Sequence, residues 1–98
     1  MLDQATLDKL KTVFAELNST YTIIIEAHDH PARMKMVEMM RDVASTSDQI
    51  HFEEHPVHDL RFRIEKDGQQ LPIEFKGIPG GNEFTTLILA ILNADGKG

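Results

Sequence analysis

Histidine, aspartate and arginine side chains gather in one short stretch of the chain. His28, Asp29 and His30 directly follow an apolar run, and Arg33 comes three residues later. Imidazole and carboxylate groups move protons near neutral pH, an arginine pairs with anions, and ligands often bind where a strand of an α/β sheet ends. The stretch is therefore a candidate ligand site. It supplies no set of nucleophile, base and orienting group, so a solvated turn with capping residues is the favoured interpretation.

Three histidines and a glutamate form a second candidate group, which consists of His51, Glu53, His55 and His58. In an extended strand, residues 51, 53 and 55 project to one side. Imidazole and carboxylate ligands suit zinc, copper or nickel. The spacing fits no strong metal motif, and a site also needs converging ligands with supporting contacts. We therefore expect no bound metal and no cofactor.

Cysteine is absent from the chain, which excludes disulfides, thiolate metal ligands and thiol nucleophiles together. Ten basic and 16 acidic residues give a net charge of −6, which argues against nucleic acid as a partner. The N-terminus has no basic and apolar leader pattern, and the longest apolar run, residues 87–92, is too short to span a bilayer. We expect one domain over residues 1–98, located in the cytoplasm and not bound to a membrane.

Three stretches have the apolar spacing of an amphipathic helix. The first is residues 3–18, and the second begins near Pro31, whose missing N–H costs nothing in a first helical turn, and ends near Ser45. The inward stripe of this second helix is predicted to be Met34, Val37, Met40, Val43 and Ala44, with Met36 and Met39 partly exposed. The third helix begins at Asn82, which is expected to cap it, and stops at Gly96.

Four stretches predict β-strands. Residues 20–27 are rich in β-branched and apolar side chains, which is typical of a central strand covered on both faces. Apolar and polar residues alternate in three further stretches, residues 50–53, 60–65 and 71–75. Asp67 and Gly68 supply the turn of a hairpin between the last two. Pro72 lacks a donor for the ladder, so it favours an edge position for the fourth strand.

The order helix, strand, helix, three strands, helix predicts an α/β protein with a thioredoxin-like fold. Its four-stranded mixed sheet has the predicted strand order 2-1-3-4, flanked by three helices that cover both faces. The connection at residues 54–59 is too short for the helix that thioredoxin has there, but at ~3.3 Å per residue it can cross beneath one strand. In such a fold, the turn His30-Pro31-Ala32-Arg33 stands where a Cys-x-x-Cys would lie.

Residues 75–92 resemble the N-terminal domain of the flavoprotein subunit of bacterial alkyl hydroperoxide reductase. The core of the resemblance is the pattern Gly-x-Pro-x-Gly-x-Glu-Phe-Thr, which here reads Gly77-Ile78-Pro79-Gly80-Gly81-Asn82-Glu83-Phe84-Thr85. An aliphatic helix follows this core. Residues 22–52 also align, without gaps, with the first strand, helix and second strand of that family, so the resemblance covers nearly the whole chain.

In that family the N-terminal region has two thioredoxin-like halves, which carry electrons from the flavin module to a peroxiredoxin. The second half carries the redox dithiol and the first half lacks it, and this chain resembles the first half. The proline that thioredoxins place in cis before the third strand is also missing, because Asp59 and Leu60 stand there and Pro56 comes too early. The resemblance therefore implies a vacated dithiol position at His30, Pro31, Ala32 and Arg33 and no catalytic residue.

These observations predict a non-catalytic thioredoxin-like module that binds or scaffolds a partner in peroxide and thiol redox metabolism. The absence of cysteine excludes thiol–disulfide exchange by this chain alone and favours a role that is not enzymatic. The expected partner is a thioredoxin-like half, a peroxiredoxin or a second copy of the chain in a homodimer, bound at an exposed sheet edge or the outer face of the Met-rich helix. The alternative is a ligand- or metal-binding protein or an enzyme that uses His28, His30 and Arg33 on a reused scaffold.

Overall fold

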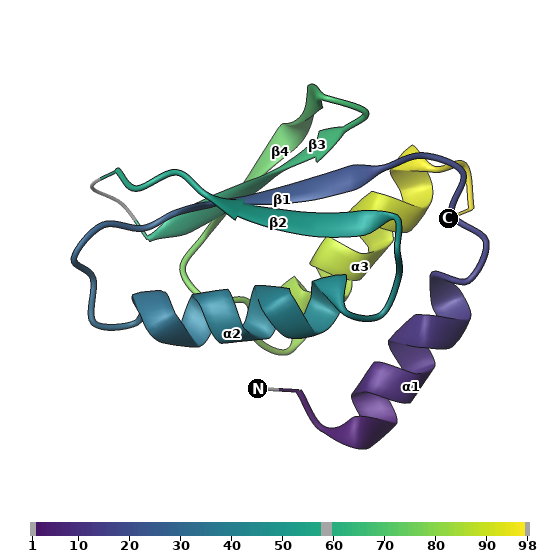
Figure 1. The fold of residues 1–98 in the computed structure, drawn as a ribbon, viewed down its shortest axis with the longest axis horizontal. Coiled ribbons are helices and arrows are strands. Elements are labelled where there is room, and N and C mark those ends of the chain that lie inside the picture. Colours follow the sequence, from purple (N-terminus) through teal and green to yellow (C-terminus); the bar gives the residue numbers. More distant parts are fainter. Residues whose placement is uncertain (1, 58–59, 98) are drawn as a thin grey trace.

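Over the residues that the structure describes, the chain forms three helices and a four-stranded sheet, in the element order that the sequence predicts (Figure 1). The computed structural model describes residues 2–57 and 60–97. The elements are α1 (Gln4–Val13), β1 (Tyr21–Glu26), α2 (Arg33–Ala44), β2 (Ile50–Glu54), β3 (Arg61–Lys66), β4 (Gln69–Lys76) and α3 (Asn82–Ala94). Within these described ranges, no helix is long and apolar enough to cross a membrane.

The sheet has the order β2-β1-β3-β4, which confirms the predicted order. β1 pairs in parallel with β2 and antiparallel with β3, and β3 pairs antiparallel with β4. Asp67 (φ 49°) and Gly68 (φ 86°) both adopt left-handed backbone conformations in the two-residue turn between β3 and β4. This is the turn geometry that matches the twist of a hairpin, so the hairpin prediction is also confirmed.

All three helices lie on one face of the sheet, as Figure 1 shows. A single apolar core joins the helices to alternate residues of the strands, among them Ile23, Ile25, Phe62 and Ile64. The prediction of helices on both faces is therefore wrong. The physical reason for the difference is the short connection between β2 and β3, which contains no helix in the part that the structure describes. The sheet face that a helix covers in thioredoxin therefore has no helix on it, and we call it the bare face.

The inward stripe of α2 differs from the prediction at two methionines. Met36 is fully buried and Met34 is 55% exposed, whereas Val37, Met40 and Val43 are buried as expected. Met36, Met40 and Val43 repeat at helical spacing, and Met34 lies about 160° around the helix from Met36 at ~100° per residue. Met34 therefore points away from the core.

The ends of α3 show one correction and one confirmation. Gly81, with φ 53°, precedes the helix and supplies the N-cap, so Asn82 is the first helical residue rather than the cap. At the other end, Gly96 N–H donates to the Asn93 carbonyl (3.0 Å) and Lys97 N–H donates to the Leu92 carbonyl (2.8 Å). These two bonds form a Schellman motif around a left-handed Gly96, which ends the helix as predicted.

β4 is an edge strand, as Pro72 predicts. The β3–β4 register shifts between Arg63 and Glu65, where three residues of β4 stand opposite one residue of β3. Pro72 lies within this irregular stretch, where its missing N–H breaks no regular ladder.

Candidate functional site

The turn between β1 and α2, which is the predicted position of the missing dithiol, is held by its own contacts. His30 Nδ1 accepts a hydrogen bond from the Ala32 N–H (3.0 Å), and the His30 carbonyl accepts one from the Arg33 N–H (3.0 Å). Asp29, with φ 51°, lets the chain reverse direction. The His30 side chain thus supports the turn that precedes α2, but the N-cap residue of the helix is Ala32, and no side chain makes a capping bond there.

The remaining polar side chains of this turn point in two directions. His28 Nε2 lies 3.3 Å from Asp29 Oδ2, and both side chains are largely exposed. Arg33 instead reaches β2 and forms a hydrogen-bonded ion pair with Glu54. The structure therefore keeps His28, Asp29 and His30 on one exposed turn but directs Arg33 toward the end of β2. Whether this turn binds a ligand stays a prediction.

The second predicted group lies on the bare face of the sheet. His55 Nε2 lies 3.3 Å from Glu53 Oε1, and both side chains are about half exposed. His51 occupies the same face of β2, because residues two apart in a strand point to the same side. His58 lies outside the described residues. Among the described residues, no three histidine, aspartate or glutamate side chains converge in a way that could hold a metal ion.

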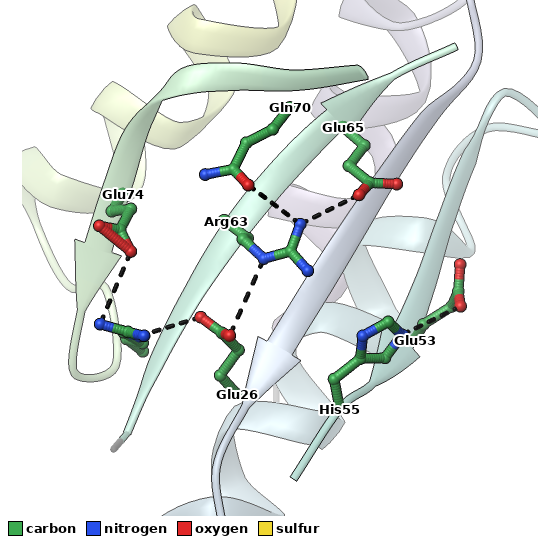
Figure 2. A network of polar contacts seen from close by, with 8 residues as sticks. Glu26, Glu53, His55, Arg63, Glu65, Gln70 and Glu74 are labelled. Carbon is green, nitrogen blue, oxygen red and sulfur yellow. Dashed lines mark hydrogen bonds and ion pairs between the residues drawn. The ribbon is translucent and has the colours of Figure 1, made fainter. Parts of the chain in front are cut away.

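Charged side chains from three strands form a connected network on the bare face, which Figure 2 shows. Glu26 of β1 accepts a hydrogen bond from Arg61 Nε (2.9 Å) and lies 3.9 Å from Arg63 Nε. Arg63 Nη1 donates to Glu65 Oε2 (3.0 Å) and to Gln70 Oε1 (3.2 Å). We call these five residues the sheet-face network. The alternation of apolar and polar residues at 60–65 predicts that the polar side chains of β3 share one face, but it does not predict their partners on β1 and β4.

The charged side chains of the sheet-face network pair with one another, and together they cover an apolar residue. Glu26 and Arg63 side chains are only 12% and 18% exposed, and the register places both on the face that carries Ile24. Ile24 is 1% exposed but does not belong to the core cluster on the helical side. Long charged side chains can cover apolar surface while their ends stay hydrated. The bare face therefore combines a buried centre with a polar, internally paired surface.

An apolar groove of about 400 Å³ lies between α1 and α3. Its apolar lining consists of Leu10, Val13, Phe84, Ile88, Leu89 and Leu92. Leu89 is 46% exposed. The groove can accommodate an apolar group, and it contains none of the predicted site residues.

Asp95 is a buried carboxylate that the sequence did not single out. Its side chain is 0% exposed and accepts hydrogen bonds from Asn18 N–H (2.9 Å), Ser19 N–H (3.0 Å), the Tyr21 hydroxyl (2.7 Å) and Lys97 Nζ (2.9 Å). Burial alone would raise the pKa of Asp95, but these four bonds outweigh burial and hold the pKa below its usual value. The contact joins the end of α3 to the start of β1, so its role is structural.

No cis peptide bond occurs in the described part of the chain. The predicted position of the missing proline falls at Asp59 and Leu60, of which Asp59 lies outside the described residues. Pro56 is exposed in the connection that leaves β2. The strand order and the thiol-free turn thus define the class of this protein, which is a thioredoxin-like domain without a redox dithiol.

Comparison with known proteins narrows this class, although no family model matches the chain. The F subunit of alkyl hydroperoxide reductase (AhpF) from Pseudomonas putida is 30% identical over 98 residues, which are 98% of this chain and 19% of that protein. AhpF from Escherichia coli (strain K12) is 32% identical over 95 residues, which are 94% of this chain and 18% of that protein. The chain thus spans about a fifth of the length of the curated relatives it matches.

A solved structure supports the same relationship at the level of the fold. The N-terminal domain of AhpF from Enterococcus faecalis (V583) matches with a TM-score of 0.87 at 19% identity, over 100% of this chain and 55% of that chain. The chain therefore resembles the N-terminal thioredoxin-like region of AhpF, as the pattern at residues 77–85 predicted.

Proposed function

We propose that this chain is a non-catalytic thioredoxin-like module that binds a protein partner in peroxide and thiol redox metabolism. The observation that carries the proposal is the absence of a thiol from the turn of residues 30–33, which we propose stands at the dithiol position. His30 supports the local backbone there, and Arg33 pairs with Glu54. A scaffold that keeps its turn but lacks the reactive group is suited to recognition rather than to electron transfer.

The class of partner follows from the relatives. These relatives are F subunits of alkyl hydroperoxide reductase, and the chain matches only about a fifth of their length. We therefore propose a partner from the same redox system, which is either a thioredoxin-like domain that carries a dithiol or a peroxiredoxin. The proposal also places the module in the cytoplasm, where a domain without disulfides keeps its fold by packing alone.

Two measurements test the proposal. The first follows disulfide reduction by the purified chain in an insulin assay, in which we expect no rate above that of buffer. The second titrates the chain, by calorimetry, with the dithiol-bearing half of Escherichia coli AhpF and separately with the matching peroxiredoxin. We expect saturable binding to one of the two, unchanged when the partner's thiols are alkylated.

Binding to neither protein at concentrations up to about 1 mM would contradict the proposal, because any contact would then have a binding free energy weaker than about −4 kcal/mol. Turnover of a disulfide or peroxide by the chain alone would contradict its non-catalytic part. The ligand site at His28, Asp29, His30 and Arg33 is the competing prediction. It requires a small-molecule or activity readout that is lost in His30→Ala while thermal stability is retained.

A further inference from the structure

The two edges of the sheet differ in their ability to accept another strand. β4 forms one edge, and there the register shift and Pro72 interrupt the row of main-chain groups. β2 forms the other edge, and its five residues pair with β1 in an unbroken parallel register. In the described part of the chain, β2 is therefore the edge that has the regular geometry needed for strand addition.

The free main-chain groups of β2 follow from its pairing with β1. The Tyr21 N–H donates to the Gln49 carbonyl (2.8 Å), and the His55 N–H donates to the Ile25 carbonyl (2.9 Å). Because bonding residues alternate along a parallel ladder, residues 49, 51, 53 and 55 bond to β1, and residues 50, 52 and 54 point their main-chain groups outward. The Ile50 N–H donates to Ser47 (3.2 Å), which leaves the Ile50 carbonyl and both groups of Phe52 and Glu54 for a further strand.

The side chains of β2 are complementary to themselves in one antiparallel register. When Phe52 stands opposite Phe52 of a second copy, His51 stands opposite Glu53 of that copy, and Glu53 stands opposite its His51. A shift of the second strand by two residues in either direction would place His51 opposite His51 or Glu53 opposite Glu53. An imidazole N–H of His51 can donate to a Glu53 carboxylate in the register centred on Phe52. Two opposing carboxylates would repel each other and two opposing imidazoles would have no carboxylate acceptor, so the side-chain pattern favours the register centred on Phe52.

We propose that two copies of this chain associate through antiparallel pairing of their β2 strands around a twofold axis at Phe52. Such a contact is isologous, because the same patch serves both copies. It forms four new main-chain hydrogen bonds, two between the Phe52 residues and two that join Glu54 N–H to the Ile50 carbonyl of the other copy. Imidazole N–H groups of His51 donate to the Glu53 carboxylates in either protonation state.

The helical side of the same edge gains contacts as well. Phe52 is partly buried, and the Arg41 guanidinium lies 5.9 Å from the centre of its ring. This contact shows that the Arg41 face of α2 borders the β2 edge. Met34 lies two helical turns before Arg41 on the same face and is 55% exposed. In the pair, Phe52 meets Phe52 of the second copy, and the second copy lies beside the Met34 face of α2.

The geometry of the β2 contact predicts that the association of two copies is weak and depends on the charges of the paired side chains. Two short strands bury far less surface than a stable dimer needs, so we expect a dissociation constant of roughly 0.1–1 mM. Each chain carries a net charge of −6, and the repulsion between copies is largely screened at 0.15 M salt. The inference goes beyond the function proposed above and does not depend on it, because the turn at residues 30–33 forms none of the new bonds.

A charge swap tests the inference with the full chain. Molar mass is measured by sedimentation equilibrium from about 10 μM to 2 mM at 0.15 M salt. We expect concentration-dependent dimerisation of the wild type and about tenfold weaker association of His51→Glu and of Glu53→His. The first substitution places carboxylate opposite carboxylate at both cross-strand pairs, and the second removes both carboxylate acceptors. The double variant His51→Glu/Glu53→His restores the pairs and should associate within about threefold of the wild type.

Matched controls change the same charges at the other edge of the same face. Gln70→Glu adds the same negative charge as His51→Glu, and Glu74→His makes the same replacement as Glu53→His, and both should leave association unchanged. All four positions are exposed, so the fold should persist, which circular dichroism verifies. A strictly monomeric wild type at 2 mM would overturn the inference. So would a dimer that the single swaps leave intact or that the double swap does not restore.

Discussion

Removal of the Asp95 carboxylate should destabilise the domain more than any other single change to a polar side chain described above. Asp95→Ala leaves the N–H groups of Asn18 and Ser19 and the hydroxyl of Tyr21 without their acceptor. A buried donor that loses a charged acceptor costs about 1–3 kcal/mol, and the Asn18 N–H is exposed enough for water to replace the lost bond. We therefore expect a loss of about 3–4 kcal/mol, and about half of that for Asp95→Asn, which keeps one acceptor oxygen.

The dependence on pH has a defined sign. Because the folded pKa of Asp95 lies below its unfolded value of 3.8, the carboxylate contributes its full stability well above pH 4. As the pH falls below about 4, Asp95 becomes protonated in the unfolded state while it stays ionised in the folded state. The contribution of Asp95 to the free energy of unfolding is therefore lost. The stability difference between the wild type and Asp95→Asn should therefore narrow steadily from pH 5 to pH 2.

Urea unfolding followed by circular dichroism at several pH values measures both effects. A loss of 3–4 kcal/mol is a large part of the 5–15 kcal/mol typical of such a domain and should lower the melting temperature by more than about 10 °C. The matched control is Asp8→Ala, because Asp8 is exposed and its side chain accepts one side-chain bond, from Gln4 Nε2 (2.8 Å), so it should cost less than about 0.5 kcal/mol. The reasoning is refuted if Asp95→Ala costs no more than this control, or if the difference does not change with pH.

Three further predictions concern the same scaffold. Tyr21→Phe should lower the free energy of unfolding by about 1 kcal/mol. In a double-mutant cycle, its effect should be less than additive with that of Asp95→Ala, because both substitutions remove the same hydrogen bond between Tyr21 and Asp95. Full additivity would show that this bond contributes nothing. Ile24→Ala should cost about 2–4 kcal/mol in urea unfolding, because the sheet-face network closes over this side chain, and a loss below 1 kcal/mol would mean that the face is open to water. His30→Cys/Arg33→Cys should form an intramolecular disulfide, seen as loss of free thiols by mass spectrometry, because the bond from Arg33 N–H to the His30 carbonyl brings the two positions within a turn; persistent free thiols under an oxidant would show that the turn has lost the geometry of a dithiol site.

Local patterns in the sequence predicted most of the fold. A continuous β-branched and apolar run predicted β1, and alternation of apolar and polar residues predicted the other three strands. The Asp67-Gly68 pair predicted the hairpin, and Pro72 predicted the edge position of β4. Each of these signals acts within a few residues, so the sequence shows it directly. The bare face results instead from the absence of a helix between β2 and β3 in the described part of the chain. The available signal was the short stretch at residues 54–59, which we interpreted as a crossing beneath one strand in a shortened fold with helices on both faces. Because this stretch is too short for a helix, it also leaves one sheet face uncovered.

The polar contacts of the site could not be predicted in the same way. Glu26, Arg63 and Gln70 come from three strands, and they meet only because the sheet order and the irregular β3–β4 register bring them together. Asp95 and Tyr21 are 74 positions apart in the chain, and their contact requires α3 to return beside the start of β1. Such pairings depend on the tertiary fold, whereas the turn at residues 30–33 was recognisable because its position between a strand and a helix is local.

The sheet-face network also bears on how this domain can associate. A partner that covered the bare face would have to remove water from Glu26, Arg63 and Glu65, whose charges already satisfy one another, and such desolvation costs several kcal/mol per ion without new pairing in return. The outward main-chain groups of β2 are different, because a second strand replaces their hydration with hydrogen bonds of the same kind. The distribution of paired and free polar groups therefore favours growth of the sheet at its β2 edge over stacking of another domain on its bare face.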